Sequence, residues 1–251
     1  MKQTEQVLVL AHGWGYNHQF FNPLLQALQN RGGLANTQVL ALECGYFPDQ
    51  AKPGLMIHTP EGWQHHPMET LHNLVLAHAS VPWIGMGHSL GMARLLSTAL
   101  RWSCLLSIHG FTRLAALTTG QAGVAPRVLA RMVSKARSNL PQVLEEFHRA
   151  CGHQPNWTTL NEAALLADLV WLQTLDLQGS LPDRLGTHSA HPTTLLAIYS
   201  PRDAIVPATL SQTCFLDAPK CTHLTVDASH GEMGVNPSRY TEALLPHLRS
   251  H

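Results

Sequence analysis

The stretch that most constrains the fold is the pentapeptide Gly-His-Ser-Leu-Gly at positions 87–91, which ends a short apolar run. The run is typical of a buried strand, and the segment 93–100 after it has a helix-like pattern. Together they predict a nucleophile elbow, a tight strand-to-helix turn that exposes the hydroxyl of Ser89. Gly87 and Gly91 fit this turn because strand and helix approach too closely for side chains. Roughly 0.09 matches to the pattern Gly-x-Ser-x-Gly are expected by chance in a chain of this length. The prediction therefore needs support from the rest of the chain.

The remaining pattern is an alternation of short apolar runs with amphipathic segments. Strands are predicted at 6–10, 38–42, 83–87, 104–108, 194–199 and 223–226, and helices at 20–29, 68–79, 127–137, 142–151, 161–172 and 241–248. The Gly-, Pro- and His-rich segment 43–67 is expected to be a loop. This alternation predicts an α/β fold with a doubly wound, mostly parallel sheet. We expect residues 1–110 and 192–251 to form its core, with 111–191 as a helical cap inserted between the fourth and fifth of these strands.

Composition excludes several classes of protein. The 251 residues carry no net formal charge and only 13% are charged, which argues against a surface that coats nucleic acid. No apolar run reaches the 18 residues of a membrane span, and the run after Lys2 is too short for a signal peptide. The five cysteines lack a Cys-x-x-Cys pair, which favours a reduced, cytoplasmic protein. The 17 histidines do not fall into a recognisable ligand pattern, so no metal site is expected.

An elbow serine needs a base to take its proton and an acid to orient that base. Along the chain, the acid is expected first after the serine and the histidine base after it. Asp203 stands after the strand 194–199 and His230 after the strand 223–226, so both belong at the carboxyl ends of strands. We therefore predict Asp203 as the orienting acid and His230 as the base. Asp227 and Glu232 are the competing carboxylates, and both are interpreted as solvated loop residues.

Two further histidines lie near the predicted centre. His88 precedes Ser89, and because adjacent side chains on such a turn point apart, it is interpreted as a packing residue. His109 leaves the strand 104–108, and two interpretations stay open for it. It either lines the pocket without catalysing or is an ordinary core histidine.

The tetrahedral intermediate of acyl transfer needs two backbone N–H donors. One is expected from Leu90, the residue after the serine, and the other from the loop after the first strand. That loop has the sequence His-Gly-Trp-Gly at positions 12–15, which makes Trp14 the second predicted donor. The indole of Trp14 is also expected to wall the acyl pocket.

The combination of these motifs resembles the α/β-hydrolase superfamily over nearly the whole chain. The matching elements are positions 12–15, positions 87–91, Asp203 before Ile-Val-Pro, and Ser-His-Gly at 229–231. Within it, the chain looks most like the pimeloyl-[acyl-carrier-protein] methyl ester carboxylesterases of biotin synthesis, on Gly-Trp-Gly-Tyr-Asn at 13–17 and the cap segment 168–182. The chain departs from the usual pattern at Met92, which replaces a second glycine, and at 43–46, where Glu-Cys-Gly-Tyr replaces Asp-x-Pro-Gly.

The resemblance implies a partner, an acyl carrier protein, which is acidic. Between residues 111 and 140 the chain has five basic residues and no acidic one. Arg127, Arg131 and Lys135 are four apart and form one helical stripe, with Arg137 nearby, and we predict that these four dock the carrier. The alternative is a solvated helix face. On the opposite side of this helix, Val128, Leu129, Met132, Val133 and Ala136 are expected to face the core and line the acyl channel with Trp14 and Leu90.

The sequence thus predicts a monomeric serine carboxylesterase that cleaves the methyl ester of pimeloyl-acyl carrier protein through an acyl-enzyme. It is expected to need no metal or organic cofactor and to bind neither nucleic acid nor membrane. One alternative is a broad-specificity short-chain carboxylesterase or thioesterase with the same triad. Another is a ligand receptor that keeps the fold and binds a ligand without converting it.

Overall fold

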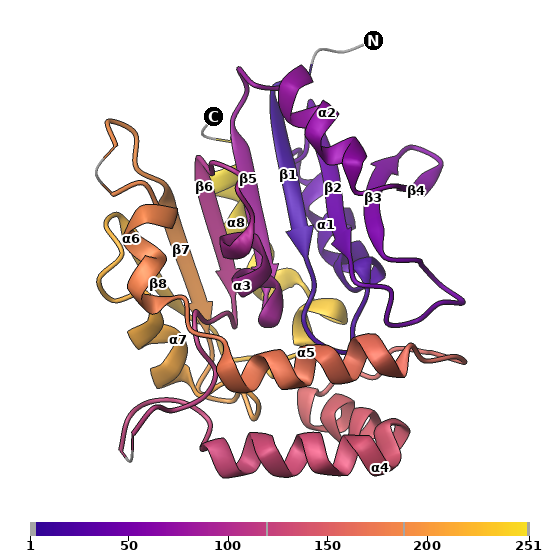
Figure 1. Ribbon diagram of the computed structural model, residues 1–251. Helices are drawn as coiled ribbons and strands as arrows, with labels where there is room; N and C mark the ends of the chain where they lie inside the picture. The colour runs from indigo at the N-terminus through magenta and orange to yellow at the C-terminus, as the bar shows by residue number, and fades with distance from the viewer. Residues whose placement is uncertain (1–3, 119, 188, 250–251) are drawn as a thin grey trace.

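A single eight-stranded sheet organises the chain in the computed structural model, which describes residues 4–118, 120–187 and 189–249 (Figure 1). The strand order is β4-β3-β2-β1-β5-β6-β7-β8. The strands are β1 (Gln6–Ala11), β2 (Thr37–Glu43), β3 (Gly54–Thr59), β4 (Gly62–His66), β5 (Trp83–His88), β6 (Cys104–Ile108), β7 (Thr194–Tyr199) and β8 (Cys221–Thr225). The six strands β2, β1, β5, β6, β7 and β8 run parallel to one another, as the alternation of strands and helices predicts.

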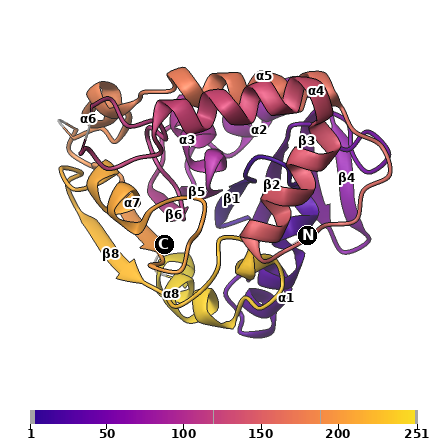
Figure 2. The same cartoon turned by 90° about the horizontal axis from the view of Figure 1, so that it is seen from below.

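Helices cover both faces of the sheet. The helices of the described residues are α1 (Asn22–Asn30), α2 (Glu69–Ala77), α3 (Leu90–Ser97), α4 (Pro126–Cys151), α5 (Glu162–Thr174), α6 (Leu181–Arg184), α7 (Ala208–Cys214) and α8 (Ser238–Arg249), with 3₁₀ turns η1 (His18–Phe21), η2 (Gln178–Ser180) and η3 (Glu232–Gly234). Helix α3 lies on one face, and α1 and α8 pack together on the other (Figures 1 and 2). Because both faces are covered, β1, β5 and β6 are buried along their whole length, which explains their unbroken apolar runs.

The helices α4 and α5 form a layer of their own across the carboxyl ends of the parallel strands (Figure 1). They belong to the segment between β6 and β7, where the sequence predicts an insertion. An ion pair between Arg94 of α3 and Asp168 of α5 joins this layer to the sheet, and the Tyr46 hydroxyl donates to the same carboxylate. The layer therefore closes the sheet edge at which Ser89, Asp203 and His230 are expected.

The two helices expected at 127–137 and 142–151 are both present. They are the two parts of α4, which spans Pro126 to Cys151 and is interrupted at Asn139, where the backbone is not helical (φ −157°, ψ 79°). Pro141 has no N–H to donate to the preceding turn, and its ring obstructs that turn, so the helix bends here instead of running straight.

The expectation of a loop over 43–67 is wrong in its second half. Residues 54–66 form an antiparallel hairpin, β3–β4, that extends the sheet beyond β2. Its outer strand has the sequence Gly-Trp-Gln-His-His and no buried residue, so it lacks the apolar run used to recognise strands. The last strand, β8, also begins two residues earlier than expected because its first residues are polar. Among the helices of the described residues, none is long and apolar enough to cross a membrane.

Candidate active site

The elbow around Ser89 has the strained geometry that its glycines suggest. Ser89 joins β5 to α3 with φ 54° and ψ −124°, a conformation that L-residues rarely adopt. Its N–H donates to the carbonyl of Ile108 at 2.9 Å, which ties the turn to the end of β6. A Cβ on Gly91 would lie 1.9 Å from the carbonyl oxygen of Ala11, and one on Gly87 would lie 2.5 Å from the backbone of Met92. Sterics thus restrict both positions to glycine.

We expect the substitution Gly91→Ala to lower the free energy of unfolding by about 3 kcal/mol, because the new methyl group meets backbone of β1 that cannot move aside. Urea unfolding followed by circular dichroism measures this loss. Gly179→Ala is the matched control: a Cβ there meets nothing within 4 Å, so its effect should be about 0.5 kcal/mol or less. Equal stability of the two variants would contradict the steric account of the elbow.

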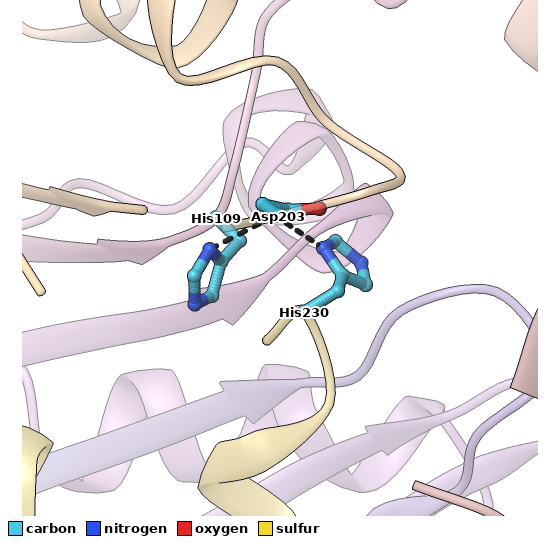
Figure 3. A group of neighbouring side chains, drawn as sticks. All are labelled: His109, Asp203 and His230. Carbon is cyan, nitrogen blue, oxygen red and sulfur yellow. Dashed lines mark hydrogen bonds and ion pairs between the residues drawn. The ribbon is translucent and has the colours of Figure 1, made fainter. Parts of the chain in front are cut away.

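Asp203 and His230 meet at the carboxyl ends of β7 and β8 (Figure 3). Nδ1 of His230 lies 2.7 Å from Oδ2 of Asp203, and Oδ1 accepts the N–H groups of Ile205 and Val206, each at 2.8 Å. Burial opposes ionisation of this carboxyl, but His230 and His109 outweigh it and hold the pKa of Asp203 well below its usual range. With Nδ1 donating to the carboxylate, Nε2 of His230 is left as a buried nitrogen without a hydrogen-bond partner among the described residues.

The two competing carboxylates lie elsewhere. Asp227 is exposed and lies 3.5 Å from the guanidinium of Arg202, which is also exposed. Glu232 accepts the backbone N–H of Ser229 at 3.0 Å. Neither carboxylate is in hydrogen-bond contact with His230.

His88 and His109 have more specific contacts than the sequence indicates. Nε2 of His88 lies 2.9 Å from the backbone carbonyl of His230, so the residue before Ser89 supports the loop of the predicted base. His109 does not line the cavity: it is fully buried, its Nδ1 lies 2.9 Å from the same Oδ2 of Asp203, and its Nε2 is 2.8 Å from the Tyr240 hydroxyl. Burial lowers the pKa of His109. The only sequence signal for this contact is its position at the end of a strand beside β7.

The ring nitrogens of His109 and His230 and the carboxylate of Asp203 are atom types that bind metal ions, and they lie within 4.8 Å of one another. The two contacts to Oδ2, at 2.9 and 2.7 Å, already occupy the space between them. A cation would have to displace both histidines from Asp203, so this cluster fits a hydrogen-bonded carboxylate better than a metal centre.

A cavity of about 290 Å³ opens beside Ser89. Its lining is mostly apolar and comes from the elbow, the cap helices and the loop after β7, and it includes Trp14, Leu90, Phe111, Val128, Leu129, Met132, Phe147, Leu169 and Val206. Five of the seven residues expected to line the acyl channel are therefore in the wall. The other two, Val133 and Ala136, are buried on the same helix but are not among the lining residues. Val128 is 52% exposed rather than facing the core, which places it at the mouth.

The loop after β1 lies directly against Ser89. A Cβ on Gly13 would come within 3.0 Å of the Ser89 Cβ, so the Gly13–Trp14 peptide passes next to the elbow. Leu90 is the first residue of α3, where a helix leaves its N–H groups without intrahelical partners. The indole of Trp14 donates to the carbonyl of Leu165 at 2.8 Å and packs edge-on against Phe147. Trp14 thus connects this loop to both cap helices.

The basic stripe lies on the outer side of α4. Arg127, Arg131, Lys135 and Arg137 are all exposed. Lys135 donates to Glu146 at 2.7 Å across the kink, so its charge is already paired. Arg127, Arg131 and Arg137 have no ion-pair partner among the residues that the structure describes, so these three cations remain available.

Comparison with protein-family models and with curated proteins finds no match. Solved structures do match along the whole chain. An esterase from Exiguobacterium antarcticum aligns with a TM-score of 0.72 and 13% identity over 99% of this chain and 94% of that one. A bromoperoxidase from Bacillus anthracis aligns with a TM-score of 0.72 and 18% identity over 99% of this chain and 93% of that one. An enol-lactonase from Burkholderia xenovorans LB400 aligns with a TM-score of 0.64 and 14% identity over 99% of this chain and 92% of that one. At these identities the likeness establishes a shared fold.

Proposed function

We propose that this chain, which has the α/β-hydrolase fold, is a serine hydrolase that cleaves carboxylic esters. The observation that carries the proposal is the buried pair of His230 and Asp203, 2.7 Å apart, at the same sheet edge as a strained Ser89 that opens into a cavity. The similarity to solved esterases and a lactonase supports the same class of reaction. Hydrolysis of p-nitrophenyl esters by the purified protein tests it, and a complete absence of turnover would favour a receptor.

In the proposed reaction, Oγ of Ser89 attacks the ester carbonyl while Nε2 of His230 accepts its proton. Asp203 holds Nδ1 of His230 and stabilises the imidazolium that forms. The N–H groups of Leu90 and Trp14 bind the oxyanion. The imidazolium then protonates the departing alcohol, which leaves an acyl-enzyme, and water activated by His230 releases the acid and restores Ser89.

For the substrate, we propose a methyl ester of a pimeloyl chain on acyl carrier protein. Three features support it. The cap segment 168–182 and the loop 13–17 resemble the pimeloyl-[acyl-carrier-protein] methyl ester carboxylesterases, the cavity beneath the cap is apolar, and the basic stripe lies at the mouth of this cavity. Val128 lines the mouth and is followed within one helical turn by Arg131. A carrier bound to Arg127 and Arg131 would therefore deliver its acyl chain directly to the opening.

We expect the double substitution Arg127→Glu and Arg131→Glu to lower kcat/KM for a carrier-linked methyl ester about 10- to 30-fold. Each exposed charge contributes about 1 kcal/mol at most to association, and the loss should appear mainly in the rate of encounter. Raising the salt concentration should reduce the wild-type rate in the same way, because the Debye length falls from about 8 Å at 0.15 M towards 3 Å at 1 M. A small water-soluble methyl ester should be hydrolysed equally well by both proteins.

The control for this experiment is a double reversal of equal charge at the opposite edge of the sheet. Arg101 and Lys220 are exposed and precede the parallel strands β6 and β8, so both lie at the end of the sheet opposite to the helices α4 and α5. Arg101→Glu with Lys220→Glu should leave kcat/KM for the carrier-linked ester within about two-fold of wild type. If the cap variant retains full activity on the carrier-linked ester, the docking proposal fails and the broad-specificity esterase becomes the better description. Equal losses on both esters would mean that the two arginines support the cap.

A further inference from the structure

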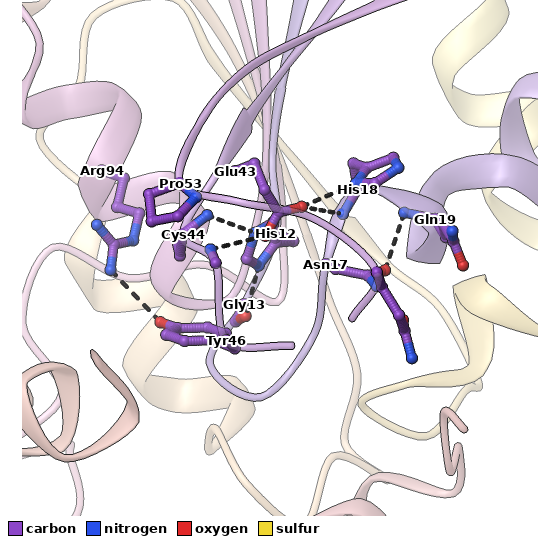
Figure 4. A network of polar contacts seen from close by, with 12 residues as sticks. His12, Gly13, Asn17, His18, Gln19, Glu43, Cys44, Tyr46, Pro53 and Arg94 are labelled. Carbon is purple, nitrogen blue, oxygen red and sulfur yellow. Dashed lines mark hydrogen bonds and ion pairs between the residues drawn. The ribbon is translucent and has the colours of Figure 1, made fainter. Parts of the chain in front are cut away.

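Glu43 is a buried carboxylate that the proposed reaction does not use. It is the last residue of β2, and its side chain is fully shielded from solvent between His12 and His18 (Figure 4). Removing a carboxylate from water is costly unless hydrogen bonds replace the lost hydration. Its contacts therefore show what it holds in place.

The carboxylate of Glu43 binds both ends of the loop that carries Trp14. Oε2 accepts the backbone N–H of His18 at 3.0 Å and lies 2.8 Å from Nδ1 of the same residue. Oε1 accepts the N–H of Gly45 at 3.0 Å and lies 3.4 Å from Nε2 of His12. Burial opposes ionisation of Glu43, but contact with His12 outweighs this effect and holds the pKa of Glu43 far below its usual range. Burial also opposes protonation of His12, but Cys44 and Glu43 raise its pKa well above the ordinary value.

The other nitrogen of His12 reaches the backbone next to Ser89. Nδ1 of His12 lies 3.0 Å from the carbonyl oxygen of Gly13, which also accepts the N–H of Tyr16 at 3.3 Å. That carbonyl and the N–H of Trp14 belong to one planar trans peptide, so they point in opposite directions. Fixing the Gly13 carbonyl on one side therefore fixes the direction of the Trp14 N–H on the other side.

We propose that Glu43, acting through His12, is a positioning residue that orients the Gly13–Trp14 peptide and thereby one of the two oxyanion donors. The inference rests on the proposed function, because Trp14 is an oxyanion donor only if the chain is a serine hydrolase. Preorganised donors stabilise the transition state because they need not reorient during the reaction. Glu43 therefore affects kcat more than substrate binding.

The decisive comparison is between the two histidines that share this carboxylate. His12 contacts both Glu43 and the Gly13 carbonyl, whereas the side chain of His18 contacts Glu43 and packs against Trp63. We expect Glu43→Gln and His12→Gln to lower kcat for a p-nitrophenyl ester about 10- to 100-fold, approaching the effect of losing one oxyanion donor, with KM changed less than about three-fold. His18→Gln should lower the melting temperature but leave kcat per folded molecule within about two-fold of wild type.

A trifluoromethyl ketone provides a readout that stability does not affect, because it forms a hemiketal oxyanion with the active-site serine. Its affinity should fall in Glu43→Gln and His12→Gln by the same factor as kcat, while the affinity for the carboxylate product stays unchanged. Circular dichroism and thermal unfolding give the folded fraction by which each rate is normalised.

The inference is overturned if Glu43→Gln and His12→Gln keep the kcat of wild type per folded molecule. It is also overturned if His18→Gln loses as much kcat as His12→Gln, since the effect would then follow loop stability rather than the path through Gly13. A wild-type protein without esterase activity would instead overturn the proposed function, so the two failures are distinguishable.

Discussion

Replacing Ser89 with alanine should reduce kcat for ester hydrolysis about 10³-fold or more while leaving the fold intact. Only the attacking oxygen is removed, and the residual rate would come from the oxyanion donors and substrate binding. The backbone of the elbow is held by its bond to Ile108 and by the glycines, so alanine can occupy the same conformation. The measurement is kcat with a saturating p-nitrophenyl ester, with circular dichroism to verify folding.

A serine on the same helix provides the matched control. The Ser97 hydroxyl donates to the carbonyl of Ala93 at 2.8 Å, at the far end of α3 from the elbow. Ser97→Ala should retain wild-type kcat. If Ser89→Ala retains more than a tenth of the wild-type turnover, Ser89 is not the nucleophile.

The substitutions His230→Ala and Asp203→Asn should each reduce kcat severely, on the order of 10³- to 10⁴-fold. The N–H groups of Ile205 and Val206 would hold the asparagine oxygen at the place of Oδ1, so the NH2 group faces Nδ1 of His230 and can only donate. The imidazole then loses the tautomer and orientation it needs. Because the two residues act as a unit, the double variant should be only slightly worse than either single one.

Asp227→Asn is the control for the acid, because this carboxylate is exposed and lies against Arg202 rather than His230. It should leave kcat within about two-fold of wild type. A damaging Asp227→Asn together with a mild Asp203→Asn would show that the acid has been assigned to the wrong aspartate.

The parts of the fold that could be predicted from sequence are those whose signal is local. The strands β1, β5, β6 and β7 are unbroken apolar runs because helices cover both faces of the sheet. The hairpin β3–β4 was missed because its outer strand, β4, is mostly polar with no buried residue, and the apolar run in β3 is only three residues long, Leu-Met-Ile at 55–57. The break in α4 could be predicted because the helical pattern of 127–137 stops before that of 142–151 begins, and the structure places the break at Asn139.

In the candidate site, too, the features that could be predicted are those with a signal in the sequence, and the others depend on contacts between distant segments. Asp203 and His230 follow strands that pair with each other, so their meeting could be expected from the order of elements. The contacts of His109 with Asp203 and of Glu43 with His12 depend on which strands are neighbours: β6 beside β7, and β1 beside β2. A histidine or a glutamate at the end of a strand gives no local sign of these partners. The pairing of Lys135 with Glu146 depends likewise on the bend of α4.

The central claim is that Ser89 forms an acyl-enzyme during ester hydrolysis, and rapid acid quenching tests it most directly. Wild-type protein mixed with an excess of a p-nitrophenyl ester is quenched within the first turnovers, and its intact mass and peptide map are recorded. The account predicts a burst of p-nitrophenol, a mass increase of one acyl group per chain, and its location on the peptide that contains Ser89. Hydrolysis with the acyl group on another residue, or with no acylated protein and no burst, would contradict it.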